Sequence, residues 1–440
     1  MAWRTSDGRI DRLVVFKAAG HDHVPVGELV FEGSGRVRQG RFAYARSWLD
    51  SADKAPIDPI GIPLRRKSVL GLPDEVPLAF YDAGPDGWGK GVLEAAFPTR
   101  TLGMAEYLAL GTHQRTGDLA FGPDPESGPA TWVPPEAPLL GLPREDDDLA
   151  ALQAAAEAVE AGHPTETHLR MLVRSSADSG GARPKARLWH DGLEWIAKFN
   201  AWGDPFDDPR MEAVCLDLAE AAGVPVPERR LETVATRTIL LVRRFDRSPT
   251  GVKHGYLSAA TLLRERHSAY ATRKTYVDIA EVARRIGVPS PAPDIYRRLL
   301  VNAFLHNTDD HLRNLAFLRK GRQWEIAPGY DLLPHRTPRH VVAPAPKMSP
   351  EWNTGSAADS YGQFGLKEGD ARDIYDRVVA GTSRIREVLE QRSVGGRDRE
   401  IIAPLMQACF TPPAWGQKLQ VKLPVPAGRE TPPLSDEPAP

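Results

Sequence analysis

The stretch from residue 302 to residue 314, NAFLHNTDDHLRN, constrains the fold of this chain more than any other. It holds three of the five asparagines of the protein, beside the acidic pair Asp309 and Asp310. Asp309 precedes Asn314 by five residues, which is the separation of the base and the metal-binding asparagine in the catalytic loop of protein kinases. Chance could supply such a pair in a chain this rich in aspartate, so the prediction of a kinase-like fold depends on further motifs.

The composition is typical of a globular protein with more than one domain. The chain has 440 residues, whereas a typical domain has ~100 to 200, so we expect two or three domains or lobes. Apolar residues make up 41% and charged residues 26%, and the formal net charge of −2 indicates neither disorder nor a polyanion-binding protein. Two cysteines, no secretory signal and no long apolar run predict a cytoplasmic protein without a membrane span.

Residues 1–125 are predicted to form a β-rich domain. Apolar alternation in this part, with glycines between the runs, is typical of short antiparallel strands joined by hairpins. The run PLAFYDAGPDGWGKGVLEAAF, residues 77–97, contains a turn signal at residues 84–87 and a helical continuation, and we interpret it as a core turn with a packed Trp88. Residues 126–148 are rich in proline, glycine and acidic side chains and are predicted to be a linker.

The remainder of the chain has the order of elements expected of two lobes. Residues 149–257 are predicted to form the smaller lobe, with helices at 149–162 and 208–222 and strands at 186–190, 193–199, 230–235 and 238–245. Residues 258–410 are predicted to form a mainly helical lobe, with helices at 275–286, 294–306 and 368–380 and a hairpin at 315–326. Residues 411–440 are a Pro-rich tail.

Phosphoryl transfer requires a cradle for the phosphates, a cation, ligands for magnesium and a base for the substrate hydroxyl. The run RSSADSGGARPKAR, residues 174–187, is the candidate cradle, because its adjacent glycines can turn backbone N–H groups toward an anion and Arg183 or Lys185 can add charge. Lys198, on the predicted strand EWIAKF, is the candidate cation. Glu212, fourteen residues later on a helix, is the candidate partner of that lysine.

The remaining two requirements have candidates farther along the chain. Asn314 and Asp331 supply the hard oxygen ligands that suit Mg²⁺, and Asp309 is the candidate base. The candidates occur in the order expected of a kinase and on plausible elements. This joint occurrence favours an ATP-dependent enzyme over any single motif taken alone.

The same residues resemble the HipA family, serine/threonine kinases that act as toxins of bacterial toxin–antitoxin pairs. GGARPKA, WIAKF, VRRFDR, NTDDHLRN and GYDLL are similar to the successive motifs of that family. LVFEGSGRVRQGRFAYARSWL and FYDAGPDGWGKG resemble its β-rich N-terminal domain, so the resemblance covers about residues 14–333. It implies an α+β fold, with a β-rich N-terminal domain followed by a two-lobed protein-kinase-like fold whose C-terminal lobe is mainly helical.

The resemblance also implies the roles of the site residues. Asp309 would be the catalytic base, Asn314 and Asp331 would bind Mg²⁺, and Glu212 would support the lysine. The residues implied to contact ATP are Gly180, Gly181, Ala182, Arg183, Pro184, Lys185, Lys198, Arg243, Arg244, Phe245, His311, Leu312, Arg313 and Asn314.

One position departs from the pattern of the family. The serine that these kinases autophosphorylate lies three residues before the second glycine, and here that residue is Asp178. Ser176 and Ser179 lie close by, so either a neighbouring serine is phosphorylated instead or self-phosphorylation is absent. An aspartate imitates phosphoserine poorly, because phosphoserine carries a charge of about −1.5 to −2.

The family likeness implies partners as well. It implies a small DNA-binding antitoxin of the HipB type, through which the kinase would contact DNA indirectly. Known substrates of the family are aminoacyl-tRNA synthetases, whose phosphorylation slows translation, so a synthetase is the candidate protein substrate. The expected protein is therefore a toxin that uses ATP and Mg²⁺ to inhibit translation.

Two other functions fit part of the pattern. The first is a non-catalytic binding module with a kinase-like fold, although every acidic and amide position needed for catalysis is present. The second is a metal-dependent phosphohydrolase, which would leave Lys198 and the glycines unexplained. Its transition metal would be bound by His306, Asp309, Asp310, His311 and His335. Considered in isolation, His335 and His340 are expected at the surface.

Overall fold

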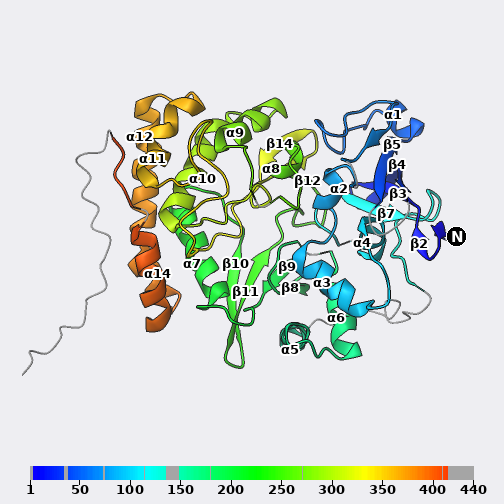
Figure 1. The fold of residues 1–440 in the computed structure, drawn as a ribbon, viewed down its shortest axis with the longest axis horizontal. Helices are drawn as coiled ribbons and strands as arrows, with labels where there is room; N and C mark the ends of the chain where they lie inside the picture. Colours follow the sequence, from blue (N-terminus) through cyan, green and yellow to red (C-terminus); the bar gives the residue numbers. More distant parts are fainter. Residues whose placement is uncertain are drawn as a thin grey trace, which may run out of the picture.

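A computed structural model describes residues 3–33, 38–72, 75–112, 114–134, 148–178, 180–269, 271–408 and 410–414. Ser179, nearly all of the second half of the predicted linker and the tail from residue 415 lie outside the described residues. The fold is α+β, as the sequence predicted, with the β-rich N-terminal domain at one end of the long axis and the helical lobe at the other (Figure 1). No described helix has the length and apolar character needed to cross a membrane.

The described part of the N-terminal domain is built on an antiparallel sheet of five strands in the order β6-β5-β4-β3-β7. Burial alternates along β5, so one of its faces packs on the core. β3 is buried on both faces, because Val14 and Phe16 pack with Ala120 on the side opposite the main core. The strands are β3 (Arg12–Ala19), β4 (Asp22–Glu32), β5 (Gln39–Tyr44), β6 (Val69–Leu70) and β7 (Leu119–Gly122), with β1 (Thr5–Ser6) and β2 (Arg9–Ile10) as a separate pair.

Short helices cover this sheet and face the rest of the molecule. Phe80 lies between Phe42 and Phe121, with ring centroids 5.4 and 6.1 Å away, and so joins a helix to the sheet. The helices are α1 (Arg46–Asp50), α2 (Ala79–Asp82), α3 (Gly87–Ala96) and α4 (Met104–Leu110). α3 begins one residue before the helical continuation expected from the sequence.

The smaller lobe contains, among the described residues, a four-stranded antiparallel sheet in the order β10-β11-β9-β8. Asp191 and Gly192 join β8 to β9, and both have positive φ angles (51° and 73°), as the predicted two-residue hairpin turn requires. Its strands are β8 (Lys185–His190), β9 (Leu193–Lys198), β10 (Arg229–Val234) and β11 (Arg237–Arg243).

Three helices accompany this sheet: α5 (Leu149–Glu160), α6 (Glu166–Ser176) and α7 (Asp208–Ala221). The N-cap of α7 is Asp207, whose side chain accepts a hydrogen bond from the N–H of Arg210, so the helix begins at Asp208, as the sequence predicted. Helix α6 was not predicted, and it continues to Ser176, so it includes the first three residues of the run 174–187 that holds the candidate cradle.

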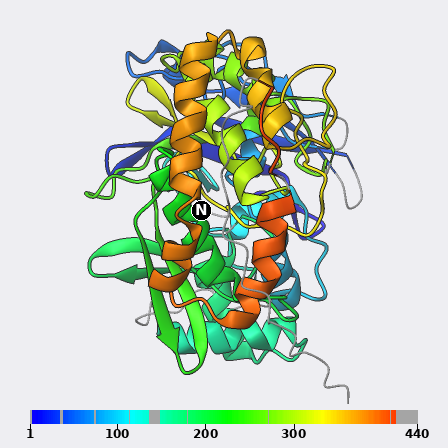
Figure 2. The ribbon, with the colours of Figure 1, turned by 90° about the vertical axis from the view of Figure 1, so that its left-hand side faces the viewer.

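The large lobe is mainly helical and is built around α10 (Pro291–Leu305). α9 (Tyr276–Arg285), α10 and α12 (Glu368–Thr382) lie within three residues of the predicted bounds. Figure 2 looks onto the last helices of the described chain, with α12 in orange and α14 in red-orange. The other helices are α8 (Ala259–Leu262), α11 (Thr354–Asp359), the 3-10 helix η2 (Ser360–Phe364), α13 (Ile385–Gln391) and α14 (Gly396–Ala408).

The predicted hairpin forms β13 (Ala316–Lys320) and β14 (Gln323–Ile326). A strand that was not predicted, β12 (Gly255–Ser258), pairs with β13 and completes a three-stranded sheet within the described residues. Because β12 has only four residues and its partner lies about sixty positions later, no local pattern marks it.

Candidate active site

Lys198, Glu212 and Asp331 meet where the two lobes face each other. The Lys198 ammonium donates to both carboxylate oxygens of Glu212, at 2.7 and 2.8 Å, and also contacts the carboxylate of Asp331. The backbone N–H of Asp331 donates to Glu212 Oε1 at 3.1 Å. β9, α7 and the segment after β14 are therefore joined by one cluster of charged groups, of which Glu212 is buried and the other two are partly exposed.

The charges in this cluster keep Asp331 ionised. Burial alone would raise the pKa of Asp331, but Lys198 and Lys185 hold it well below its usual range. Burial also opposes the charged form of Lys198, yet the attraction of Asp331 and Glu212 outweighs it and raises the pKa of Lys198. An ionised carboxylate beside a permanently charged lysine is the arrangement that a Mg²⁺–nucleotide site needs.

Lys185, at the start of β8, brings a second ammonium group to this place. A Cβ atom added at Gly181, which has a φ of +79°, would lie 2.5 Å from Lys185 Nζ and 3.9 Å from Asp331 Oδ2. The positive φ favours glycine at position 181, whereas Lys185 Nζ, at the end of a flexible side chain, could move away from an added Cβ atom. Burial lowers the pKa of Lys185.

The candidate catalytic loop, residues 307–314, follows α10, which ends at His306 in a left-handed conformation (φ 52°). The side-chain amide of Asn314 donates to the backbone oxygen of Asp309 at 2.9 Å, so the loop folds back on itself and holds these two residues together. The side chain of Asp309 is 51% exposed, and His311 Nε2 lies 3.8 Å from its carboxylate. Asp309 can therefore receive a hydroxyl group that approaches from solvent.

Asp310 belongs to the same loop but, in contrast to Asp309, is buried. Its carboxylate accepts hydrogen bonds from the N–H of Val341 (2.8 Å), the hydroxyl of Tyr276 (2.8 Å) and His340 Nδ1 (3.2 Å). His340 is only 3% exposed and stacks on Trp352 at 3.5 Å, so the expectation of a surface residue was wrong. Asp310 thus anchors the loop to Tyr276 of α9 and to residues 340–341.

The asparagines before the loop extend the same support. Asn302 donates to the hydroxyl of Tyr276 at 2.7 Å, and Asn307 donates to the side-chain oxygen of Asn302 at 2.9 Å. This contact indicates a structural role for Asn307. This geometry also disfavours the transition-metal site, because the Asp310 carboxylate is already engaged by buried donors and His306 Nδ1 contacts the backbone oxygen of His335.

Arg243, at the end of β11, and the next two residues, Arg244 and Phe245, are implied by the resemblance to contact ATP. Arg243 pairs with Glu228 at 3.1 Å, and both side chains are partly exposed. Arg244 is buried and donates to the backbone oxygen of Arg115 at 3.1 Å, so its side chain points to the N-terminal domain. Phe245 packs on Tyr330, the neighbour of Asp331 in the chain, with ring centroids 5.5 Å apart, and is thus the side chain of the three that lies beside the cluster of Lys198, Glu212 and Asp331, through its contact with Tyr330.

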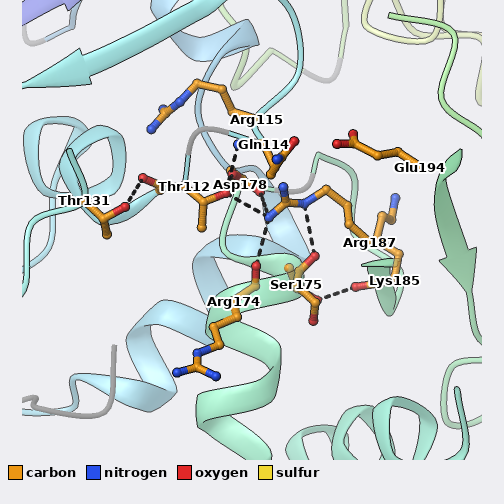
Figure 3. Close-up of polar contacts among 12 residues, drawn as sticks. Thr112, Gln114, Arg115, Thr131, Arg174, Ser175, Asp178, Lys185, Arg187 and Glu194 are labelled. Atoms are coloured by element: carbon orange, nitrogen blue, oxygen red, sulfur yellow. Dashed lines mark hydrogen bonds and ion pairs between the residues drawn. The ribbon is translucent and has the colours of Figure 1, made fainter. Parts of the chain in front are cut away.

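The glycine-rich loop, residues 180–185, is preceded by a buried polar cluster (Figure 3). Asp178 forms an ion pair with Arg187 at 2.8 Å and accepts a hydrogen bond from the hydroxyl of Thr112 at 2.9 Å. Arg187 also donates to the backbone oxygens of Arg174 (3.0 Å) and Ser175 (3.2 Å) at the end of α6. Asp178, at the position of the serine that the family autophosphorylates, is therefore buried and forms an ion pair with a structural role.

The neighbouring serines differ in what the structure says of them. Ser176 is 0% exposed, and its hydroxyl donates to the backbone oxygen of Lys185 at 2.6 Å, so in this conformation it cannot reach a phosphate donor. Ser179 lies outside the described residues. Within the loop itself, Arg183 pairs with Asp204 and Asp208, each at 2.5 Å, and thereby ties the loop to the start of α7.

Comparison with known proteins adds a family and a fold. Residues 177–385 match the model of the HipA-like C-terminal domain. Among solved structures, the chain is similar to the Shewanella oneidensis MR-1 toxin–antitoxin system HipA, HipB and operator DNA complex, with 16% identity, a TM-score of 0.63, and coverage of 89% of this chain and 95% of that chain. It has a much weaker likeness to the Helicobacter pylori proinflammatory kinase CtkA, with 14% identity, a TM-score of 0.39, and coverage of 51% and 88%. A search among curated proteins finds no match.

Proposed function

The chain belongs to the HipA family, and we propose that it is an ATP-dependent serine/threonine protein kinase that transfers the γ-phosphate of ATP to a protein hydroxyl. The observation that carries the proposal is the contact of one lysine, Lys198, with both Glu212 and Asp331. In protein kinases a strand lysine paired with a helix glutamate holds the phosphates, and a nearby aspartate holds the metal. Three separate elements are needed to build this arrangement, so it is far more specific than the spacing of Asp309 and Asn314.

Each residue of the site has a role in this reaction. Asp309 would accept the proton of the substrate hydroxyl. The oxygen of that hydroxyl would form a bond to the γ-phosphorus as the bond from the γ-phosphorus to ADP breaks. Lys198 would bind the nonreacting phosphates, and the N–H groups of the glycine-rich loop would cover them. Asn314 and Asp331 offer the carboxamide and carboxylate oxygens that suit Mg²⁺, which would neutralise charge on the phosphates when bound.

We further propose that the protein is a cytoplasmic toxin that inhibits translation and is restrained by a small HipB-like DNA-binding antitoxin, through which it would reach DNA. Support comes from the fold, which is similar over most of the chain to HipA in a structure that also contains HipB and operator DNA. An aminoacyl-tRNA synthetase is the candidate substrate, on the family resemblance alone. A Lys198-containing site that bound ATP without transferring phosphate would instead favour the non-catalytic binding module.

The proposal is tested with purified protein, labelled ATP and Mg²⁺, comparing wild type with Asp309→Gln. We expect the wild type to transfer phosphate to itself or to a protein in a cell extract, and Asp309→Gln to lose about 10²- to 10⁴-fold in rate while it still binds ATP. Growth arrest on expression, relieved by Asp309→Gln, would support toxicity. A wild type that neither binds ATP nor transfers its phosphate contradicts the proposal.

A further inference from the structure

Residues 86–88 of the N-terminal domain lie directly against the glycine-rich loop. The backbone N–H of Trp88 donates to the backbone oxygen of Gly181 at 2.9 Å, and the indole N–H donates to the backbone oxygen of Lys185, also at 2.9 Å. Because α3 begins at Gly87, the N–H of Trp88 is one of the groups that find no partner within their own helix. The glycine-rich loop supplies that partner.

Gly87 makes this contact possible. A Cβ atom added at Gly87 would lie 2.8 Å from the Cα of Ala182 and 3.0 Å from the backbone oxygen of Gly181. Both of these atoms belong to backbone, so they cannot turn away as a side chain could. The segment was interpreted from the sequence as a core turn, but its glycine and its tryptophan contact the candidate phosphate cradle, about ninety-four residues later in the chain.

The same segment also holds the candidate catalytic loop. The carboxylate of Asp86 forms an ion pair with Arg313, which lies between Asp309 and Asn314. Burial would raise the pKa of Asp86, but Arg313 and the N–H of Gly87 lower it, so Asp86 is charged. A contact with the large lobe, through Asp86, and a contact with the smaller lobe, through Trp88, are therefore made by residues only two positions apart.

A second contact from the N-terminal domain reaches the other side of the glycine-rich loop. Thr112, just after α4, donates to Asp178 at 2.9 Å, and Arg187 of β8 contacts both residues (Figure 3). Asp178 and Arg187 are buried, so water does not compete for this ion pair. The loop is thus held on its N-terminal side through Thr112 and on its C-terminal side through Trp88.

We propose that the N-terminal domain positions the two loops of the nucleotide site. Gly87 and Trp88 hold the glycine-rich loop, and Asp86 holds the catalytic loop, at the separation that phosphoryl transfer requires. The inference rests on the proposed kinase activity. These three are positioning residues, because they contact the two loops and not the reacting atoms. Their effect on the rate follows from geometry, since a displacement of about 1 Å in such a site costs on the order of 10²-fold.

Two glycines of α3 provide a matched test. Gly87→Ala places a methyl group against the backbone of Ala182, whereas Gly91→Ala, one turn later on the same helix, meets no atom within 4 Å. Alanine favours a helix over glycine by about 0.5–1 kcal/mol, so neither change should lower the Tm through helix propensity. We expect Gly87→Ala to raise the KM for ATP and to lower kcat/KM at least tenfold, and Gly91→Ala to change neither.

Two tryptophans provide a second pair, which remains informative if Gly87→Ala fails to fold. Trp88 and Trp48 are 7% and 8% exposed, and each indole N–H donates to a backbone oxygen, that of Ala55 in the case of Trp48. Both Trp→Phe variants lose one hydrogen bond and keep an aromatic ring. We expect Trp88→Phe to raise the KM for ATP about threefold to tenfold, and Trp48→Phe to leave it at the wild-type value even where the Tm falls by the same amount.

Amide hydrogen exchange over residues 177–187 gives a readout that does not need activity. Faster exchange there in Gly87→Ala and Trp88→Phe, but not in Gly91→Ala and Trp48→Phe, is the expected result. If the wild type is active and each pair of variants agrees in KM, kcat and exchange, the inference is wrong and the proposed function stands. If the wild type is inactive, the proposed function fails, and unchanged exchange in Gly87→Ala would then overturn the contact role as well.

Discussion

Replacing Lys198 by methionine should destabilise the protein in a pH-dependent way. The substitution removes the ammonium group that lies 2.7 Å from Glu212 and in contact with Asp331. At an effective dielectric constant of about 20, a pair of unit charges at that separation attracts by about 6 kcal/mol. Because desolvation of the lysine offsets part of this attraction, we expect Lys198→Met to lower the free energy of unfolding by about 3–5 kcal/mol at pH 8.

The pH dependence follows from the carboxylates that remain. In the wild type, Lys198 holds the pKa of Asp331 below its unfolded value, so this stabilisation is present above the ordinary range of an aspartate and is lost as the pH falls. In Lys198→Met, the buried carboxylate of Glu212 and the partly exposed carboxylate of Asp331 lose the cation between them, and one of the two takes up a proton at a raised pKa. The difference in Tm between wild type and variant should therefore be largest at pH 8 and shrink toward pH 5.

The measurement is thermal unfolding of the nucleotide-free protein at half-unit steps from pH 5 to pH 8. Lys320→Met is the control, since Lys320 pairs with Glu325 but both side chains are nearly half exposed, and exposed pairs contribute little. Lys198→Met/Glu212→Met should recover part of the loss, because it removes one of the two uncompensated charges. A Tm difference for Lys198→Met that matches Lys320→Met, or that does not vary with pH, would refute this reasoning.

The remaining predictions concern three buried groups. Asp310→Ala should lower the Tm by several degrees, because the catalytic loop loses its hydrogen bonds with Tyr276 and Val341. Steady-state kinetics should show a larger change in kcat than in the KM for ATP. Ser176→Ala should leave any self-phosphorylation at the wild-type level by mass spectrometry, because Ser176 is fully buried. Burial would raise the pKa of Asp246, but Arg244 and Arg247 hold it well below its usual range, so its stabilisation is present at neutral pH and lost in acid. Asp246→Asn should therefore lower the Tm more at pH 7 than at pH 3, which lies below the unfolded pKa of an aspartate.

The sequence could predict those parts of the site whose residues are marked by local pattern. Lys198 follows a turn of two residues and an alternating strand, and Glu212 lies on a helix with a recognisable start, so each could be placed on its element before any contact was known. The local patterns leave open only whether the lysine and the glutamate face each other. The order of motifs expected of a kinase predicts that they do, and the structure brings the two side chains together.

The contacts that could not be predicted join residues without such a pattern. Trp88 reaches Gly181 through backbone atoms, and backbone atoms leave no signature in the identity of a residue. Asp310 is held by His340 and Val341, which lie in an irregular segment about thirty residues later, where neither helical nor strand periodicity applies. Asp178 looked like a substituted phosphorylation site, and only its burial beside Arg187 shows that it is also an ion-pair partner.

Three of the segments implied to contact ATP share a property that their sequences do not show, because each of them contacts the N-terminal domain. The glycine-rich loop contacts Trp88, the catalytic loop contacts Asp86 through Arg313, and the strand end after β11 contacts Arg115 through Arg244. Each partner belongs to the N-terminal domain, outside the matched HipA-like C-terminal domain of residues 177–385. The matched region thus holds the residues proposed to act on ATP, while part of their relative placement is set by a domain that holds none of them. A change in how the N-terminal domain packs would therefore alter all three segments together.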